Sequence, residues 1–82
     1  MLLASCAGAP SGHPTCKDAR STQNHGLEWV EAMGQARQSG KLSVEQMAQV
    51  HSESLEKLPL LGNQKWSEYC TELDALRESA GF

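Results

Sequence analysis

The C-terminal segment, residues 63–82, carries the pattern that most constrains the fold of this chain. Its apolar residues recur at steps of three and four positions, which places them on one stripe of a helix with 3.6 residues per turn. Other parts of the chain must cover that stripe, so the pattern predicts a helix packed against further helices. We expect it to span residues 64–80, with Asn63 as its N-cap and Gly81 as the left-handed residue that ends it. The stripe consists of Trp66, Tyr69, Cys70, Leu73, Leu76 and Ala80.

A second helix is predicted over residues 26–38. Asn24 is a good N-cap in front of it, and the pair Ser39 and Gly40 ends it. Trp29 is expected at the edge of the helix, where an exposed indole would indicate a partner surface. We expect the inner edge to comprise Leu27, Val30, Met33 or Gly34, and Arg37.

A third helix is predicted over residues 44–58. Ser43 and Gln46 have the spacing of a capping box, and Leu42 is placed to pack on Met47 as a hydrophobic staple. Pro59 stops the helix, because proline lacks an N–H and its ring clashes with the preceding turn. The expected apolar face comprises Val44, Met47, Ala48, His51, Leu55 and Leu58.

These three segments predict an all-α fold, a small three-helix bundle over residues 15–82. No stretch alternates apolar and polar residues as a strand does, and short connections between helices favour antiparallel neighbours. A chain of 82 residues allows one small domain. A core of that size usually needs a disulfide, a metal or a partner to be stable.

The N-terminus carries a short motif followed by a run of small residues. Leu3, Ala4, Ser5 and Cys6 resemble the lipobox of bacterial lipoproteins, in which a peptidase cuts before an acylated cysteine. The resemblance implies that Cys6 becomes the first residue and carries the lipid, with residues 6–14 as a flexible tether. It also implies an outer-membrane address facing the periplasm, because Ala7 and not aspartate follows the cysteine.

Residues 1–5 are interpreted as the remnant of a signal peptide. Such a peptide has a basic start and an apolar stretch of about 7 to 15 residues, whereas the residues before Cys6 are few and uncharged. We therefore expect the signal to have begun further upstream. The competing interpretation is an accidental match, with Cys6 as a free thiol.

The lipoprotein resemblance also accounts for the three cysteines. With Cys6 acylated, Cys16 and Cys70 form one pair that an oxidising periplasm would bridge. Closing so long a loop contributes about 4 kcal/mol in the chain-entropy model. The alternative is a cytosolic helical interaction domain in which these cysteines are reduced.

Charge and motifs exclude several classes of function. The net charge is −3 and no cluster of lysine or arginine occurs, so we expect no nucleic-acid partner. No stretch approaches the roughly 18 apolar residues of a membrane span. His51 has no nucleophile at a spacing typical of hydrolases, and we expect it to be a structural histidine and the protein not to be an enzyme.

Metal and partner sites leave weaker patterns. The third hypothesis is a metal-binding carrier, because the N-terminal part contains the metal-binding residue types Cys6, His13, Cys16 and His25. These residues lack the paired spacing of zinc sites, so we expect no cofactor. The acidic pairs of the last helix form a solvated face that is a candidate docking face for a basic protein partner. The pairs are Glu68 with Glu72 and Asp74 with Glu78, and the expected partner surface comprises Trp29, Glu68 and Glu72.

Overall fold

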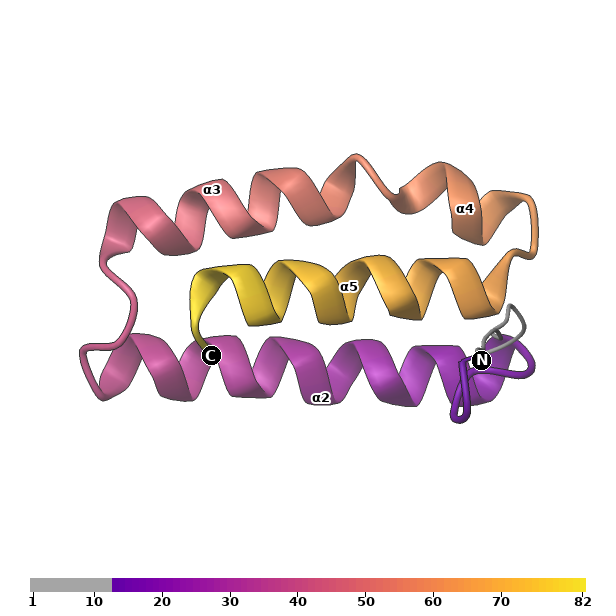
Figure 1. Cartoon of the computed structure of the whole chain (residues 1–82), viewed down its shortest axis with the longest axis horizontal. Helices are drawn as coiled ribbons and strands as arrows, with labels where there is room; N and C mark the ends of the chain where they lie inside the picture. The colour runs from indigo at the N-terminus through magenta and orange to yellow at the C-terminus, as the bar shows by residue number, and fades with distance from the viewer. Residues whose placement is uncertain (1–12) are drawn as a thin grey trace, which may run out of the picture.

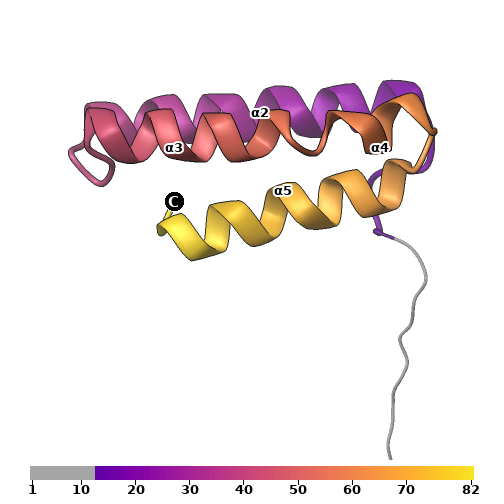
Figure 2. The ribbon, with the colours of Figure 1, turned by 90° about the horizontal axis from the view of Figure 1, so that it is seen from above.

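A computed structural model describes residues 13–82 of the chain, and within them it contains helices and no strand. The elements are α2 (Ala19–Gln38), α3 (Val44–Leu55), the short α4 (Leu58–Gly62) and α5 (Trp66–Ala80). α3 runs antiparallel to α2, and α5 returns alongside both (Figure 1). Seen from above, α2 and α3 form one layer and α5 lies beside that layer, so the long helices enclose a shared core (Figure 2). The predicted all-α three-helix bundle is confirmed.

α2 begins well before the predicted start at residue 26. Asp18 and not Asn24 is the N-cap, because the Asp18 carboxylate accepts the backbone N–H of Ser21 while the Ser21 hydroxyl accepts the N–H of Asp18. This reciprocal capping satisfies two helix-end donors, and Asn24 then lies within the helix. The predicted end at Ser39 and Gly40 is confirmed, with Gly40 at φ 85°.

The predicted helix 44–58 ends early, at Leu55, and the short α4 begins at Leu58 and runs past the predicted stop at Pro59. The capping box of Ser43 and Gln46 is present as expected. Pro59 ends α3 four residues earlier than its own position, because its ring would clash with the carbonyl of Leu55 and it has no N–H to donate there. It lies instead in the first turn of α4, where that missing donor costs nothing.

α5 begins at Trp66, two residues after the predicted start. Gln64 has φ 58°, a left-handed conformation that a right-handed helix cannot include. Asn63 is the C-cap of α4, where its side-chain amide donates to the carbonyl of Pro59. At the other end Gly81 takes the predicted left-handed conformation, and the N–H of Phe82 bonds back to the carbonyl of Arg77.

The core lies between α2, α5 and the start of α3. The predicted stripe of α5 is confirmed from Tyr69 onward, since Cys70 and Leu73 are buried and Tyr69, Leu76 and Ala80 are partly buried against the core. Trp66, the first residue of the predicted stripe, lines a cleft instead. None of the described helices is long and apolar enough to cross a bilayer. The core cluster comprises Trp29, Met33, Ala36, Leu42, Val50 and Leu73.

The predicted inner edge of α2 is confirmed for Met33, which is buried in the core, but is wrong for Leu27 and Val30. Leu27 and Val30 are 60 % and 53 % exposed, whereas Trp29 is only 3 % exposed. The Trp29 indole N–H donates to the carbonyl of Leu73 at 2.7 Å, and its ring packs edge-on against Phe82. The helix has turned its largest side chain inward, because an indole buries more apolar area than leucine or valine. Trp29 therefore does not belong to a partner surface.

The predicted face of α3 is also rotated. Val50 and Ser54 are buried, while Val44 and Leu55 are exposed. His51, which we placed on the apolar face, is exposed as well. The helix carries apolar residues on two sides, and the side that includes Val50 is the one in contact with α5.

Candidate functional site

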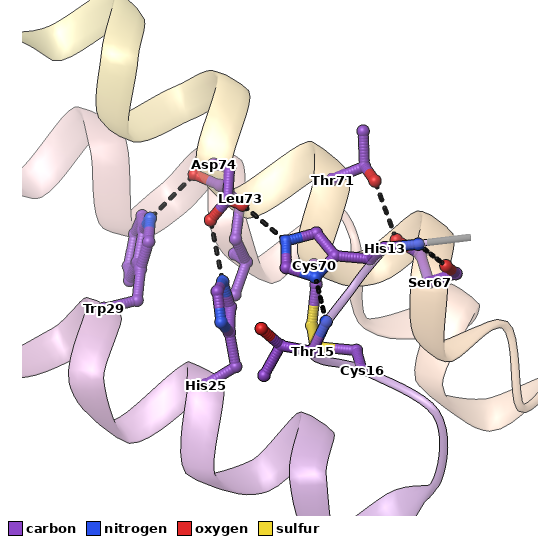
Figure 3. Close-up of polar contacts among 10 residues, drawn as sticks. All are labelled: His13, Thr15, Cys16, His25, Trp29, Ser67, Cys70, Thr71, Leu73 and Asp74. Atoms are coloured by element: carbon purple, nitrogen blue, oxygen red, sulfur yellow. Dashed lines mark hydrogen bonds and ion pairs between the residues drawn. A yellow bond between two sulfur atoms is a disulfide. The ribbon is translucent and has the colours of Figure 1, made fainter. Parts of the chain in front are cut away.

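The side chains that could bind a ligand or react gather at one end of the bundle, where α2 and α5 both begin. Figure 3 shows a disulfide, two histidines and one aspartate packed together there. The residues come from three segments: the stretch before α2, the first half of α2 and the middle of α5. The segment that leads in from the N-terminus therefore meets the domain at this place.

Cys16 and Cys70 form the predicted disulfide. Both residues are buried, and their Cα atoms are 6.5 Å apart, within the usual range of about 4.4–6.8 Å. Cys16 lies two residues before the N-cap of α2, and Cys70 lies in the second turn of α5. The bridge thus ties the start of α2 to α5 over a sequence separation of 54.

Beside the disulfide, His13 and His25 both contact the carboxylate of Asp74. We name these three residues the histidine–aspartate cluster. The Nε2 atom of His13 is 2.6 Å from Oδ2 of Asp74, and the Nε2 atom of His25 is 2.7 Å from Oδ1. The two rings meet edge to face with centroids 4.8 Å apart (Figure 3). Each oxygen of one carboxylate is therefore paired with a different imidazole.

The tautomer of His13 follows from its second contact. Its Nδ1 atom accepts the backbone N–H of Thr15 at 3.1 Å, so the ring proton is on Nε2, where it is donated to Asp74. The backbone N–H of His13 also bonds to the hydroxyl of Ser67 in the first turn of α5. These contacts hold the segment before Cys16 along the surface of α5.

The two imidazoles also set the ionisation of Asp74. Partial burial raises its pKa, but the hydrogen bonds from His13 and His25, together with their charge when protonated, outweigh burial. The net result is a pKa for Asp74 below its ordinary value. The carboxylate is therefore a stable anion over the physiological pH range.

A cleft lies on another side of the same end, between α2, α4 and α5. Its volume is about 390 Å³, and we name it the α2–α5 cleft. The exposed side chains of Leu27 and Val30 form one wall, and Leu61 and Trp66 stand opposite. The remaining lining residues are Ala19, Thr22, Gln23, Gly26 and Tyr69.

The two predicted acidic residues of the partner surface lie on α5 but are not unopposed. Glu72 pairs with Lys57 at 3.1 Å, and Glu68 lies 3.9 Å from Lys65. Surface pairs of this kind contribute little to stability, yet they offset much of the negative charge. A docking face at Glu68 and Glu72 remains a prediction. The predicted lipidation residue, Cys6, lies outside the described residues.

The sequence pattern indicates His13 and His25 as metal-binding residue types but does not indicate their common partner. By pattern, Asp74 belongs to a solvated acidic face together with Glu78. The two histidines stand far from Asp74 in the sequence, so spacing carried no signal of the cluster. The signal that existed was the predicted disulfide, since bridging Cys16 to Cys70 brings residues near 13 within reach of residues near 74.

The chain was compared with protein-family models, curated proteins and solved structures, and none matches it.

Proposed function

We propose that this protein is a small lipid-anchored protein of the bacterial envelope, and that its helical domain binds a protein partner without catalysis. The observation that carries the proposal is the buried disulfide between Cys16 and Cys70. Structural disulfides are typical of exported proteins and rare in the cytosol. The pair uses two of the three cysteines of the sequence, and the third is Cys6, the residue that the lipobox resemblance assigns to the lipid.

The α2–α5 cleft is the surface that we assign to the partner. Leu27 and Val30 are large apolar side chains that the fold leaves more than half exposed, and they border a concave surface whose other wall contains Trp66. A concave apolar surface with a tryptophan in its wall is typical of a groove that accepts the apolar face of a helix. We expect the partner to insert apolar side chains of an amphipathic helix there.

The location of the cleft fits an anchored protein. It is built from the first half of α2 and the first turns of α5, the same end at which His13 and the disulfide lie. The predicted tether of residues 6–14 is too long by its last residues, because Ser67 and Asp74 hold His13 against α5. A tether that ends before His13 would join the domain at this end. A partner bound in the cleft would then lie on the side of the domain nearest the membrane.

Photo-crosslinking in the native host tests the binding surface. We expect a photoreactive amino acid at Val30 to capture one envelope protein of defined mass. The matched control is Val44, a helical valine that is 59 % exposed at the opposite end of the bundle. We expect no capture from Val44, and Val30→Glu should remove the partner from complexes purified under mild conditions.

Two results would contradict this assignment. Equal capture from Val30 and Val44 would mean that exposure alone determines crosslinking. A product with the mass of two copies of this chain would mean that the cleft serves self-association.

A further inference from the structure

We propose that the histidine–aspartate cluster is a binding site for one divalent cation of the zinc class, formed while the Cys16–Cys70 disulfide is intact. The ligand atoms would be Nε2 of His13, Nε2 of His25 and a carboxylate oxygen of Asp74. These atoms all lie within 4.8 Å of one another. Two imidazoles and a carboxylate, with one position left for water, form a recognised ligand set for zinc.

The distances require only a small adjustment to admit an ion. Zinc is bound by nitrogen and oxygen at about 2.0–2.2 Å, so two ligand atoms of a tetrahedral site lie roughly 3.3 Å apart. The two nitrogens here approach the carboxylate oxygens at 2.6 Å and 2.7 Å, with a proton between each pair. One cation would fit if each nitrogen–oxygen separation lengthened by less than about 1 Å and the two nitrogens, which lie within 4.8 Å of each other, reached the same spacing. The ring protons would then move from Nε2 to Nδ1.

Solvent reaches the cluster from the side of the carboxylate. The side chains of His13 and His25 are 11 % and 17 % exposed, whereas that of Asp74 is 44 % exposed. An open hollow beside His25 and Asp74 is lined by Glu78, which adds a second carboxylate one turn further along α5. The histidines are thus held in place by the protein, and an ion has a path to them through anionic surroundings.

The side chain of Arg77 does not occupy the proposed position of the ion. Arg77 also lines the hollow, but its Nε–H donates to the carbonyl of Phe82 and its guanidinium lies over the Phe82 ring. Among the described residues, the basic side chains that Asp74 contacts are those of the two histidines themselves. Neutral imidazole is the form that binds metals, and when its proton moves from Nε2 to Nδ1 an ion beside Nε2 gives the carboxylate a stronger counter-charge.

Metal binding has one local consequence that an experiment can detect. With the ion on Nε2, the proton of the His13 ring must be on Nδ1, which then cannot accept the N–H of Thr15. Thr15 is exposed, so its N–H can bond to water instead. We expect the amide resonance of Thr15 to shift when the ion binds.

The disulfide is close to the cluster but separate from it. The sulfurs of Cys16 and Cys70 also lie near His25, and reduced thiolates would be strong zinc ligands. In the bridged protein these sulfurs are not thiolates. The ion proposed here would instead fasten the segment at His13 to α5, next to the covalent bond at Cys16.

Zinc titration of the oxidised protein tests the proposal. All variants carry Cys6→Ser, which removes the remaining thiol, and circular dichroism checks that each is folded. Calorimetry should give one ion per chain, unaffected by excess Mg²⁺, and the Thr15 amide should move in step with binding. Asp74→Asn and His25→Ala should each weaken binding by about tenfold to a hundredfold or more. His51→Ala changes an exposed histidine outside the cluster and should leave the affinity unchanged.

Three results would overturn the proposal. One is the absence of stoichiometric binding to the oxidised protein. Another is an affinity that His51→Ala lowers as much as His25→Ala does, which would indicate non-specific binding to surface histidines. The third is binding that appears only after reduction, since Cys16 and Cys70 would then be the ligands. The envelope function would stand after any of these results, because it rests on other residues.

Discussion

Asp74 joins parts of the chain that are distant in sequence. Its carboxylate receives His13 from the stretch before α2 and His25 from within α2, while the preceding residue, Leu73, accepts the indole N–H of Trp29 through its carbonyl. One short stretch of α5 thus makes both a polar contact at the surface and a buried hydrogen bond in the core. Substitutions at single residues should separate these two contributions.

Substitutions at Trp29 and Leu27 test which face of α2 is buried. Trp29→Phe removes the bond to the Leu73 carbonyl and part of the buried ring, so we expect a loss of about 1–3 kcal/mol in the free energy of unfolding. Leu27→Ala removes a mostly exposed side chain and should change stability by less than about 0.5 kcal/mol. Urea unfolding measures both. A larger loss for Leu27→Ala would mean that α2 is rotated from the orientation described here.

At the scale of the helices, α2 is defined by its ends. Asp18 closes a capping box with Ser21 two residues after Cys16, and the disulfide holds that start against α5. Thr22 adds to the same turn, because its buried hydroxyl donates to the carbonyl of Asp18. The first turn of α2 is therefore secured by side-chain bonds and by a covalent bond.

The cap of α2 predicts a dependence on pH. Hydrogen bonds from the backbone N–H and hydroxyl of Ser21 hold the pKa of Asp18 below its ordinary value. A lowered folded-state pKa means that the carboxylate stabilises the folded chain above its ordinary pKa, and that this contribution is lost as the pH falls through the lowered value. An NMR titration should show the Asp18 carboxyl and the Ser21 amide shifting together below the ordinary pKa of aspartate.

Asp18→Asn is the control for this titration. Asparagine is also a good N-cap but does not ionise, so the acid-induced shift of the Ser21 amide should disappear while α2 keeps its first turn. An Asp18 carboxyl that titrates at or above the ordinary value would contradict the capping geometry.

The helices themselves were largely predictable, because periodicity and end signals are local. The stripe of α5 from Tyr69 onward, the capping box at Ser43 and the end of α5 at Gly81 all appear as expected. The faces of α2 and α3 were not predictable, since both helices carry apolar residues on two sides and only tertiary packing decides which side is buried. Gln64 shows a further limit, because its left-handed backbone could not be inferred from a residue type that rarely adopts it.

At the scale of the whole molecule, the disulfide and the core share the task of stability. The described core has few large side chains, and a domain of this size is marginal without a staple. The bridge joins the first described segment to the last helix, so it limits the unfolded chain more than a short loop would. Because the candidate sites surround this bridge, their geometry depends on it.

Removing the bridge should therefore destabilise the domain strongly. The double variant Cys16→Ser and Cys70→Ser should lose about 4 kcal/mol, which for a chain of this length lowers the melting temperature by well over 10 °C or unfolds the protein. Cys6→Ser, outside the described residues, is the matched control and should melt with the parent protein. Thermal denaturation followed by circular dichroism measures both. An unchanged melting temperature in the double variant would show that the bridge does not support the fold.

We propose that the chain is an exported lipoprotein, and its buried bridge is the one disulfide that the described residues form. The most direct test of this proposal is the intact mass of the native protein recovered from membrane and soluble fractions of its host. We predict a membrane-bound species that begins at Cys6, is heavier by its acyl chains, and gains the mass of two hydrogens when Cys16 and Cys70 are reduced. A soluble chain that retains Met1 and three free thiols would contradict this account and favour a cytosolic helical interaction domain.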